Sequence, residues 1–129
     1  MKRILVADDN EADVYLLREG LSATGLEYEL EHVYDGDVAI QRLLAPGERG
    51  QPDLVILDLH LPKVSGRSVV QAIESKGLSV PIIVLTSLSS ERDRQALKSL
   101  GVLLILDKPA DLESCFALGR LIHEFLQNR

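Results

Sequence analysis

Four apolar runs of the sequence end at, or just before, side chains that could do chemistry. These side chains are Asp8 and Asp9 after residues 4–7, Asp58 at the end of residues 53–58, Thr86 after residues 80–85, and Lys108 just beyond residues 102–106. Three carboxylates brought into one crevice repel one another, and a hard divalent cation such as Mg²⁺, which prefers oxygen ligands, would relieve that repulsion. An Asp carboxylate can also act as a nucleophile that accepts a phosphoryl group.

The formal charges of these residues are matched to such chemistry. The charges of Asp8, Asp9, Asp58, Lys108 and one Mg²⁺ cancel before any substrate arrives. A phosphoryl group on Asp58 would add about one further negative charge and new acceptor oxygens, which the metal, the Lys108 ammonium and the Thr86 hydroxyl are suited to hold. In phosphoryl transfer the protein contributes mainly positioning and charge neutralisation. This set of residues therefore favours Asp58 as a phosphoryl acceptor.

Each residue also has a purely structural interpretation. Asp8 and Asp9 could begin a helix, where acidic side chains favour the helix dipole. Thr86 could cap the end of a strand, and Lys108 could be a solvated loop charge. The distribution of such residues over the ends of four different runs favours the functional interpretation.

Alternating strands and helices are expected to position these residues. Strands are predicted at 4–7, 28–34, 53–58, 80–85 and 102–106, and helices from a cap at Asn10 to before Gly25, at 38–44, 67–76 and 90–100, and from Asp111 almost to the terminus. The run 54–57 lacks polar alternation, which is typical of a strand buried on both faces of a parallel sheet. The alternation predicts an α/β fold with right-handed crossovers and helices on both faces. Ligands of such folds bind at the carboxyl ends of the strands, where the candidate residues should converge.

Length, charge and composition narrow the class of protein. A chain of 129 residues suits a single domain, 1–129, with one packed core. The net charge of −6 argues against direct binding of nucleic acid or of an anionic membrane. No apolar stretch is long enough to span a bilayer, and the amino terminus resembles neither a signal peptide nor an anchor, so we expect a cytoplasmic protein. The lone cysteine, Cys115, excludes an intrachain disulfide and a cysteine-based zinc site.

The pattern as a whole resembles the receiver domain of two-component response regulators, and the resemblance covers the full chain. The residues that carry it are Asp8-Asp9, Asp58, Leu61-Pro62 with Gly66, Thr86-Ser87 and Lys108-Pro109. The resemblance implies a flavodoxin-like, doubly wound parallel sheet of five strands in the order 2-1-3-4-5, with five helices. Residues 7–13 and 16–19 look most like the small stand-alone receivers, similar to the chemotaxis regulator, that include partners of bacterial phytochromes.

The resemblance also implies a role for each residue. Asp58 would be the phosphoacceptor. Asp9, Asp58 and the backbone carbonyl of His60 would ligate Mg²⁺ directly, and Asp8 would hold it through water. Thr86 and Lys108 would contact the phosphoryl group. The expected function is a signalling module that takes a phosphoryl group from a histidine kinase, such as a phytochrome-type sensor, and switches conformation toward protein partners, with slow self-dephosphorylation as its only enzymatic activity.

Other functions stay open at this point. A Mg²⁺-dependent phosphatase or phosphotransferase would also use an Asp nucleophile, but such enzymes commonly carry a second acid two residues later, where this chain has His60. A phosphohistidine or a transition-metal site at His60 lacks a second histidine at a suitable spacing. A pseudo-receiver scaffold would never be phosphorylated, and the intact set of five residues counts against it. Ile105 stands where many receivers carry an aromatic residue, so we expect a switch through Thr86 and the loop after it, or an unusually small conformational gap.

The last predicted helix carries more apolar surface than one face needs. One stripe, expected to cover the sheet, consists of Leu112, Cys115, Phe116, Gly119, Ile122 and Leu126, and a second consists of Leu118, Leu121 and Phe125. The combined arc spans roughly 220°, about twice the ~100° that a surface helix needs to face its core. We expect a homodimer or a partner site at the second stripe. The alternative is that the helix packs deeply enough to bury both stripes.

Overall fold

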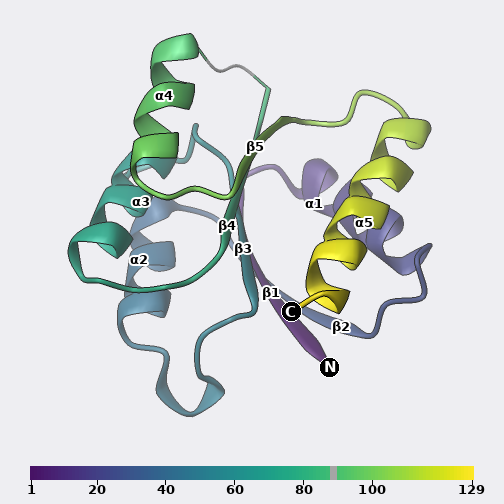
Figure 1. Cartoon of the computed structure of the whole chain (residues 1–129), viewed down its shortest axis with the longest axis horizontal. Coiled ribbons are helices and arrows are strands. Elements are labelled where there is room, and N and C mark those ends of the chain that lie inside the picture. The colour runs from purple at the N-terminus through teal and green to yellow at the C-terminus, as the bar shows by residue number, and fades with distance from the viewer. Residues whose placement is uncertain (88–89) are drawn as a thin grey trace.

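The computed structural model describes residues 1–87 and 90–129, and within these ranges strands and helices alternate along the chain (Figure 1). The strands are β1 (Lys2–Ala7), β2 (Tyr28–Val33), β3 (Leu54–Leu57), β4 (Ile82–Thr86) and β5 (Leu104–Asp107). The helices are α1 (Glu11–Ser22), α2 (Gly36–Leu44), α3 (Gly66–Ser75), α4 (Glu91–Ser99) and α5 (Leu112–Gln127), and a 3₁₀ turn, η1 (Gly47–Arg49), precedes β3.

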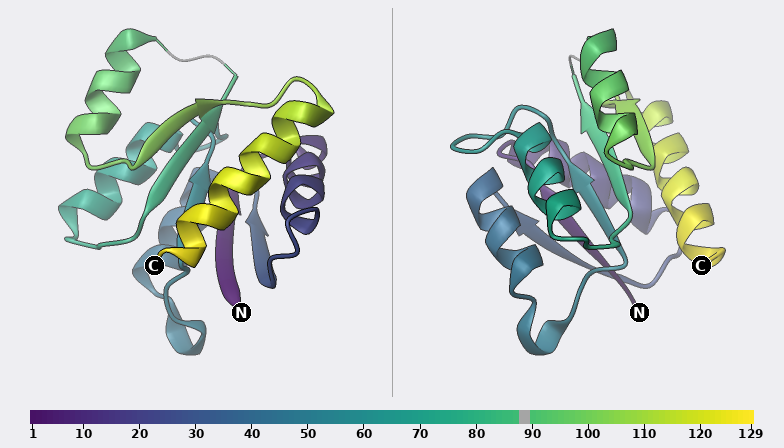
Figure 2. Two further views of the ribbon diagram at one scale, coloured as in Figure 1. Left: turned by 45° about the vertical axis from the view of Figure 1, so that its right-hand side comes forward. Right: turned by 60° about the vertical axis from the view of Figure 1, so that its left-hand side comes forward.

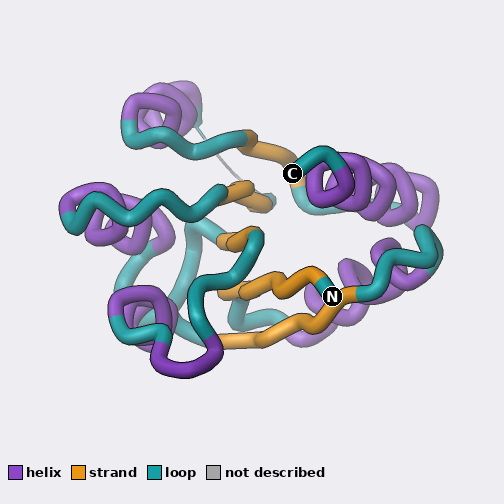
Figure 3. The backbone as a smooth tube through the Cα atoms, turned by 60° about the horizontal axis from the view of Figure 1, so that its bottom comes forward, coloured by secondary structure: helices purple, strands orange, loops and turns teal. Residues whose placement is uncertain are grey.

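The strands form one parallel sheet in the order β2-β1-β3-β4-β5. Helices α2, α3 and α4 cover one face, and α1 and α5 cover the other (Figures 1 and 2). In Figure 3 the strands, drawn in orange, lie between these two helical layers. The predicted doubly wound fold and its strand order are therefore confirmed.

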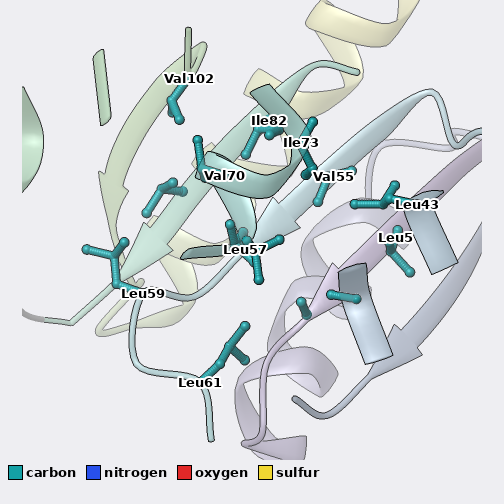
Figure 4. Close-up of a cluster of buried hydrophobic side chains, with 14 of the residues drawn as sticks. Leu5, Leu43, Val55, Leu57, Leu59, Leu61, Val70, Ile73, Ile82 and Val102 are labelled. Atoms are coloured by element: carbon teal, nitrogen blue, oxygen red, sulfur yellow. The ribbon is translucent and has the colours of Figure 1, made fainter. Parts of the chain in front are cut away.

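Alternate residues of the central strands supply two separate cores. Leu5, Val55 and Leu57 pack with α2, α3 and α4, where the side chains of Val70 and Ile73 meet them (Figure 4). The residues between them in sequence point to the opposite face and pack with α1 and α5; they are Ile4, Val6, Leu54 and Ile56. All four residues of β3 are buried, which explains why this run has no polar alternation.

Side-chain caps fix the residue at which each helix begins. A capping side chain accepts a backbone N–H of the first helical turn at Asn10, Asp35, Ser65, Ser90 and Asp111. Such caps satisfy donors that have no partner within the helix. Because each helix follows a loop at the carboxyl edge of the sheet, the caps also set where the chain leaves that edge.

The boundaries of the predicted elements shift by one or two residues. The strand predicted at 80–85 begins at Ile82, since Pro81 has no N–H to donate, although its carbonyl accepts a hydrogen bond from Val55 at 2.9 Å. The strand predicted at 102–106 runs from Leu104 to Asp107. The turn η1 lies between the predicted helix at 38–44 and the predicted strand at 53–58, where no regular element is predicted.

The predicted faces of α5 were wrong at three positions. Leu112 and Phe116, expected to cover the sheet, are 61% and 37% exposed, whereas Leu118 is only 8% exposed. Leu121 and Phe125 are half-buried against the same core. The face expected to bind a second copy is therefore largely packed inside the protein, which is the alternative left open by the sequence.

The crossing of α5 with α1 is the physical reason. A Cβ added at Gly119 would strike the backbone of Gly20, and one added at Gly20 would strike the carbonyl of Cys115. The two helices thus approach backbone to backbone, and α5 has both the sheet and α1 as neighbours, so that it buries a wider arc than a helix on a sheet alone. In the part of the chain described here, neither α5 nor any other helix has the length and apolarity needed to cross a bilayer.

Candidate functional site

Three carboxylates gather at the carboxyl edge of the sheet, where β1 and β3 end side by side. Ala7 pairs with Leu57 in the parallel register, so the residues that follow them, Asp8 and Asp58, leave neighbouring strands at the same level. The Asp58 N–H donates to the Ala7 carbonyl at 3.0 Å. One carboxylate oxygen from each of Asp8, Asp9 and Asp58 lies within 4.8 Å of the other two. Asp8 and Asp58 are each 5% exposed, whereas Asp9 faces solvent.

Short backbone turns orient the two buried carboxylates. The N–H of Asn10 donates to Asp8 Oδ1 at 2.9 Å, and the N–H of His60 donates to Asp58 Oδ1 at 3.1 Å. In both cases an Asp side chain accepts from the residue two positions later, the usual Asx turn. One oxygen of each carboxylate is thereby fixed, and the Oδ2 atoms are directed toward Lys108.

The Lys108 ammonium lies among carboxylates from three different segments. Its Nζ is 3.1 Å from Asp8 Oδ2, 3.0 Å from Asp58 Oδ2 and 2.6 Å from Asp13 Oδ2. The lysine side chain is 12% exposed. An ammonium has three N–H donors, so each of them can meet one carboxylate. The backbone N–H of Lys108 donates to the Thr86 carbonyl at 3.0 Å, which ties the end of β5 to the end of β4.

Burial and nearby charges act in opposite directions on the pKa values of Asp8 and Lys108, and both values are raised. Burial raises the pKa of the Asp8 carboxyl above its usual range, and this effect outweighs the lowering by the Asn10 N–H and by Lys108. Burial alone would lower the pKa of the Lys108 ammonium, but hydrogen bonds to Asp13 and Asp58 and the charge of Asp8 more than reverse this, and the pKa is raised. Lys108 is therefore a permanent positive charge in the site.

Thr86, His60 and Ile105 lie at different depths on the strands and loops that lead to this centre. Thr86 is the last residue of β4 and is fully buried. His60 is exposed, two residues after Asp58. Ile105 is half-buried on β5 against the core under α2, α3 and α4. The loop after Thr86, named above as one route for a switch, includes residues 88–89, which lie outside the described residues.

Asp13 is the residue at the site that the sequence analysis missed. As an acid in the first turn of α1 it has an ordinary structural explanation, since it favours the helix dipole. Its position carried a further signal, since Asp13 is four residues before Leu17 and so lies on the core-facing side of α1, one turn from the cap at Asn10. An acid on that side, at the end of α1 nearest the carboxyl edge of the sheet, is directed toward the other acids.

His32 supports the site from β2. Its Nε2 donates to the backbone carbonyl of Asp8 at 2.7 Å, and its ring stacks on Tyr34 with 4.1 Å between the ring centroids. Tyr34 in turn donates to Glu11 Oε1 at 2.7 Å. The His32 bond to the Asp8 carbonyl braces the turn that presents Asp8.

The donor set fits a hard divalent cation. The clustered ligand atoms are carboxylate oxygens, which both Mg²⁺ and Mn²⁺ prefer. Asp9 is open to solvent, so water can complete the coordination, as is usual for Mg²⁺. One ammonium among four nearby carboxylates leaves a negative charge that a divalent cation would offset.

This fold, with acids and a lysine at the ends of its central strands, defines a receiver domain. The sequence profile of the family "Response regulator receiver domain" matches residues 4–118 of the chain. The chain therefore belongs to the response regulator receiver family.

Individual relatives show which response regulators the chain is similar to. The chain is similar to the response regulator Rcp1 of Synechocystis sp., with 34% identity over 129 residues that cover 96% of this chain and 88% of Rcp1. It is also 36% identical over 120 residues to the response regulator MprA of Mycobacterium ulcerans, which covers 93% of this chain and 49% of MprA. The chain thus spans about half the length of MprA.

Solved structures agree with these relatives. The phosphorylated cyanobacterial phytochrome response regulator RcpA superposes with a TM-score of 0.86 at 36% identity, covering 96% of this chain and 92% of RcpA. The Mn²⁺-bound form of Rcp1 gives a TM-score of 0.85 at 34% identity, covering 98% of this chain and 94% of that chain. The predicted resemblance to phytochrome-linked response regulators is confirmed.

Proposed function

We propose that this response regulator takes a phosphoryl group from a histidine kinase onto Asp58 and passes the signal to protein partners by a change of conformation. The observation that carries the proposal is the setting of Asp58. Its carboxylate is buried at the end of the central strand, beside two further acids, with Oδ2 3.0 Å from Lys108. A phytochrome-type sensor is the proposed kinase class, because RcpA is a phytochrome response regulator.

Phosphoryl transfer to Asp58 forms one bond to phosphorus and breaks another. An Asp58 oxygen forms the new bond to phosphorus while the bond from phosphorus to the imidazole nitrogen of the kinase breaks. A bound divalent cation would neutralise the oxygens of the phosphoryl group. Lys108 and the Thr86 hydroxyl are proposed to hold those oxygens after transfer.

The proposed ligands of the cation are the clustered acids. Asp9, Asp58 and the backbone carbonyl of His60 would bind it directly, and Asp8 would bind through water. Mg²⁺ is the proposed ion, because it keeps several waters and is bound by few carboxylates. Burial of Asp8 and exposure of Asp9 support this division of roles, since the solvent-facing carboxylate is the one a hydrated ion reaches first.

Acetyl phosphate tests the function without a kinase. Wild-type protein incubated with acetyl phosphate and Mg²⁺ should gain one phosphoryl group by intact-mass spectrometry, and Asp58→Asn should gain none. Asp53→Asn is the matched control, since Asp53 and Asp58 flank β3 at its opposite ends. The Asp53 carboxylate accepts the Arg3 N–H at 2.8 Å, away from the cluster. Labelling of Asp58→Asn, or no labelling of wild type, would refute the proposal.

Asp9→Asn should weaken Mg²⁺ binding on the order of tenfold or more, since it removes one charged ligand from a site of few ligands. The same substitution should raise the midpoint of urea unfolding in EDTA, because it neutralises one of three mutually repelling carboxylates. Calorimetric titration and urea unfolding measure the two effects. Asp107→Asn is the control, since Asp107 pairs with Arg94 at 3.4 Å instead of joining the acid cluster. Unchanged Mg²⁺ affinity in Asp9→Asn would remove Asp9 from the ligand set.

Several wider expectations belong to the same proposal. Residues 1–129 would act as a single receiver domain in the cytoplasm, with protein partners rather than nucleic acid, in keeping with the net charge of −6. Turnover beyond slow self-dephosphorylation is not proposed. The homodimer expected through Leu118, Leu121 and Phe125 is not carried forward, because Leu118 is buried and the other two are half-buried.

A further inference from the structure

We propose that Asp13 is a positioning residue that holds the Lys108 ammonium in the resting state and competes with the phosphoryl group for it. The inference rests on the proposed function, since it assumes that Asp58 is phosphorylated and that Lys108 then binds the phosphoryl oxygens. It assigns Asp13 a part in setting how readily the phosphorylated state forms.

The geometry singles out Asp13 as the nearest partner of the lysine. The distance from Nζ to Asp13 Oδ2 is 2.6 Å, shorter than the 3.0 Å to Asp58 and the 3.1 Å to Asp8. Asp13 comes from α1, whose first turn is fixed because the Asn10 side chain accepts the Asp13 N–H at 3.2 Å. The contact therefore ties the end of β5 to α1, two segments that are 95 residues apart in sequence.

The number of donors makes the contact competitive. The three N–H groups of an ammonium are already matched by the carboxylates of Asp8, Asp13 and Asp58. A phosphoryl group on Asp58 brings further acceptor oxygens, and Lys108 can turn to them only by releasing a partner. The Asp13 side chain is 31% exposed, against 7% for Asp8 and 6% for Asp58. Water can replace the ammonium most easily at Asp13, so this contact is the one released at least cost.

The local charge points the same way. With Asp13 counted, four carboxylates face one ammonium, and a divalent cation leaves the site with one net negative charge where the three clustered acids alone would leave it neutral. A phosphoryl group adds about one more negative charge. Asp13 thus opposes phosphorylation twice, because it occupies the lysine and because it repels the incoming group.

Neutralising Asp13 should therefore favour the phosphorylated state. We expect Asp13→Asn to bind beryllofluoride, a phosphoryl mimic, roughly tenfold more tightly than wild type in the presence of Mg²⁺. This size is that of a charge-assisted hydrogen bond reduced for the partial exposure of Asp13. Fluorine NMR titration measures the affinity, and the initial rate of labelling by acetyl phosphate should rise in the same variant.

Glu11→Gln is the matched control. Glu11 is the other acid in the first turn of α1, and its carboxylate accepts from the Tyr34 hydroxyl instead of from Lys108. The substitution removes the same charge from the same end of the same helix. Beryllofluoride affinity of Glu11→Gln should stay within about twofold of wild type, the size of an exposed charge effect. An equal gain in Glu11→Gln and Asp13→Asn would reduce the role of Asp13 to general charge and overturn the proposal.

Removal of the lysine shows whether Asp13 acts through it. In a Lys108→Ala background, Asp13→Asn should raise beryllofluoride affinity by no more than about twofold, since only charge repulsion at a partly exposed position is left to relieve. The contact between Asp13 and Lys108 in the resting state can be tested without metal or beryllofluoride. Because the two side chains interact, the effects of Asp13→Asn and Lys108→Ala on the urea midpoint in EDTA should be non-additive. Additive effects, or a gain of about tenfold that persists in full without Lys108, would refute the proposal. If wild type itself binds no beryllofluoride, the proposed function fails; if wild type binds and Asp13→Asn merely equals it, only the role of Asp13 fails.

Discussion

Lys108→Ala is expected to retain Mg²⁺ binding and to lose most of the conformational response to beryllofluoride. The clustered acids remain in the variant, but the positive charge 3.0 Å from Asp58 Oδ2 is gone. Hydrogen–deuterium exchange of α4, β5 and α5, recorded with and without beryllofluoride, measures the response. A full response in Lys108→Ala would show that residues other than Lys108 couple the phosphoryl group to the change of conformation.

The same substitution should destabilise the metal-free protein by about 2 kcal/mol at neutral pH, because breaking a buried ion pair leaves uncompensated charge. The loss should shrink at mildly acidic pH. Burial raises the pKa of Asp8 and Lys108 opposes that rise, so in Lys108→Ala the pKa of Asp8 is raised further, the folded variant binds more protons than the unfolded chain, and its stability falls as the pH rises through that window. Lys63→Ala is the control, since Lys63 is 69% exposed and pairs with Asp35 at 3.7 Å on the surface. Equal losses in the two variants would contradict a special role of Lys108.

Gly119→Ala should have the second large effect, a loss of about 2–3 kcal/mol in the free energy of unfolding. An alanine in an open helix position would stabilise by up to about 1 kcal/mol relative to glycine, so the sign of the change is itself the test. The added methyl group would meet the backbone of Gly20 on α1, and a backbone yields less easily than a side chain. Urea unfolding measures the effect.

Glu124→Ala provides the comparison on the same helix. Glu124 is exposed, and its replacement should change stability by less than about 0.5 kcal/mol. A Gly119→Ala protein as stable as wild type would mean that α1 and α5 lie farther apart than the structure has them.

The strand and helix order was predictable because the sequence carries it locally. Apolar runs such as 54–57 are short, free of polar residues and bounded by helix caps such as Asn10, and those features need no knowledge of distant residues. The meeting of Asp8 and Asp58 at one edge also follows from parallel strands alone.

The features that could not be predicted depend on contacts between distant segments. The rotation of α5 is set by the approach of Gly119 to Gly20, and a helical wheel of α5 contains no information about α1. The bond between Asp13 and Lys108 joins residues 95 positions apart. The helical spacing places Asp13 on the core-facing side of α1, but an acid in the first turn of a helix has a sufficient local explanation, and its partner Lys108 lies in a distant segment.

The most direct test of the account is to locate the phosphoryl group. Protein phosphorylated with acetyl phosphate and Mg²⁺ is reduced with borohydride, which converts a phosphorylated Asp to homoserine by exchanging one oxygen atom for two hydrogen atoms. Trypsin then releases residues 50–63, a peptide that holds Asp53, Asp58 and His60. Fragmentation should find the conversion at Asp58 and leave Asp53 unchanged. Conversion at Asp53 or in another peptide, or a phosphoryl group retained on His60 with no converted Asp, would contradict the account.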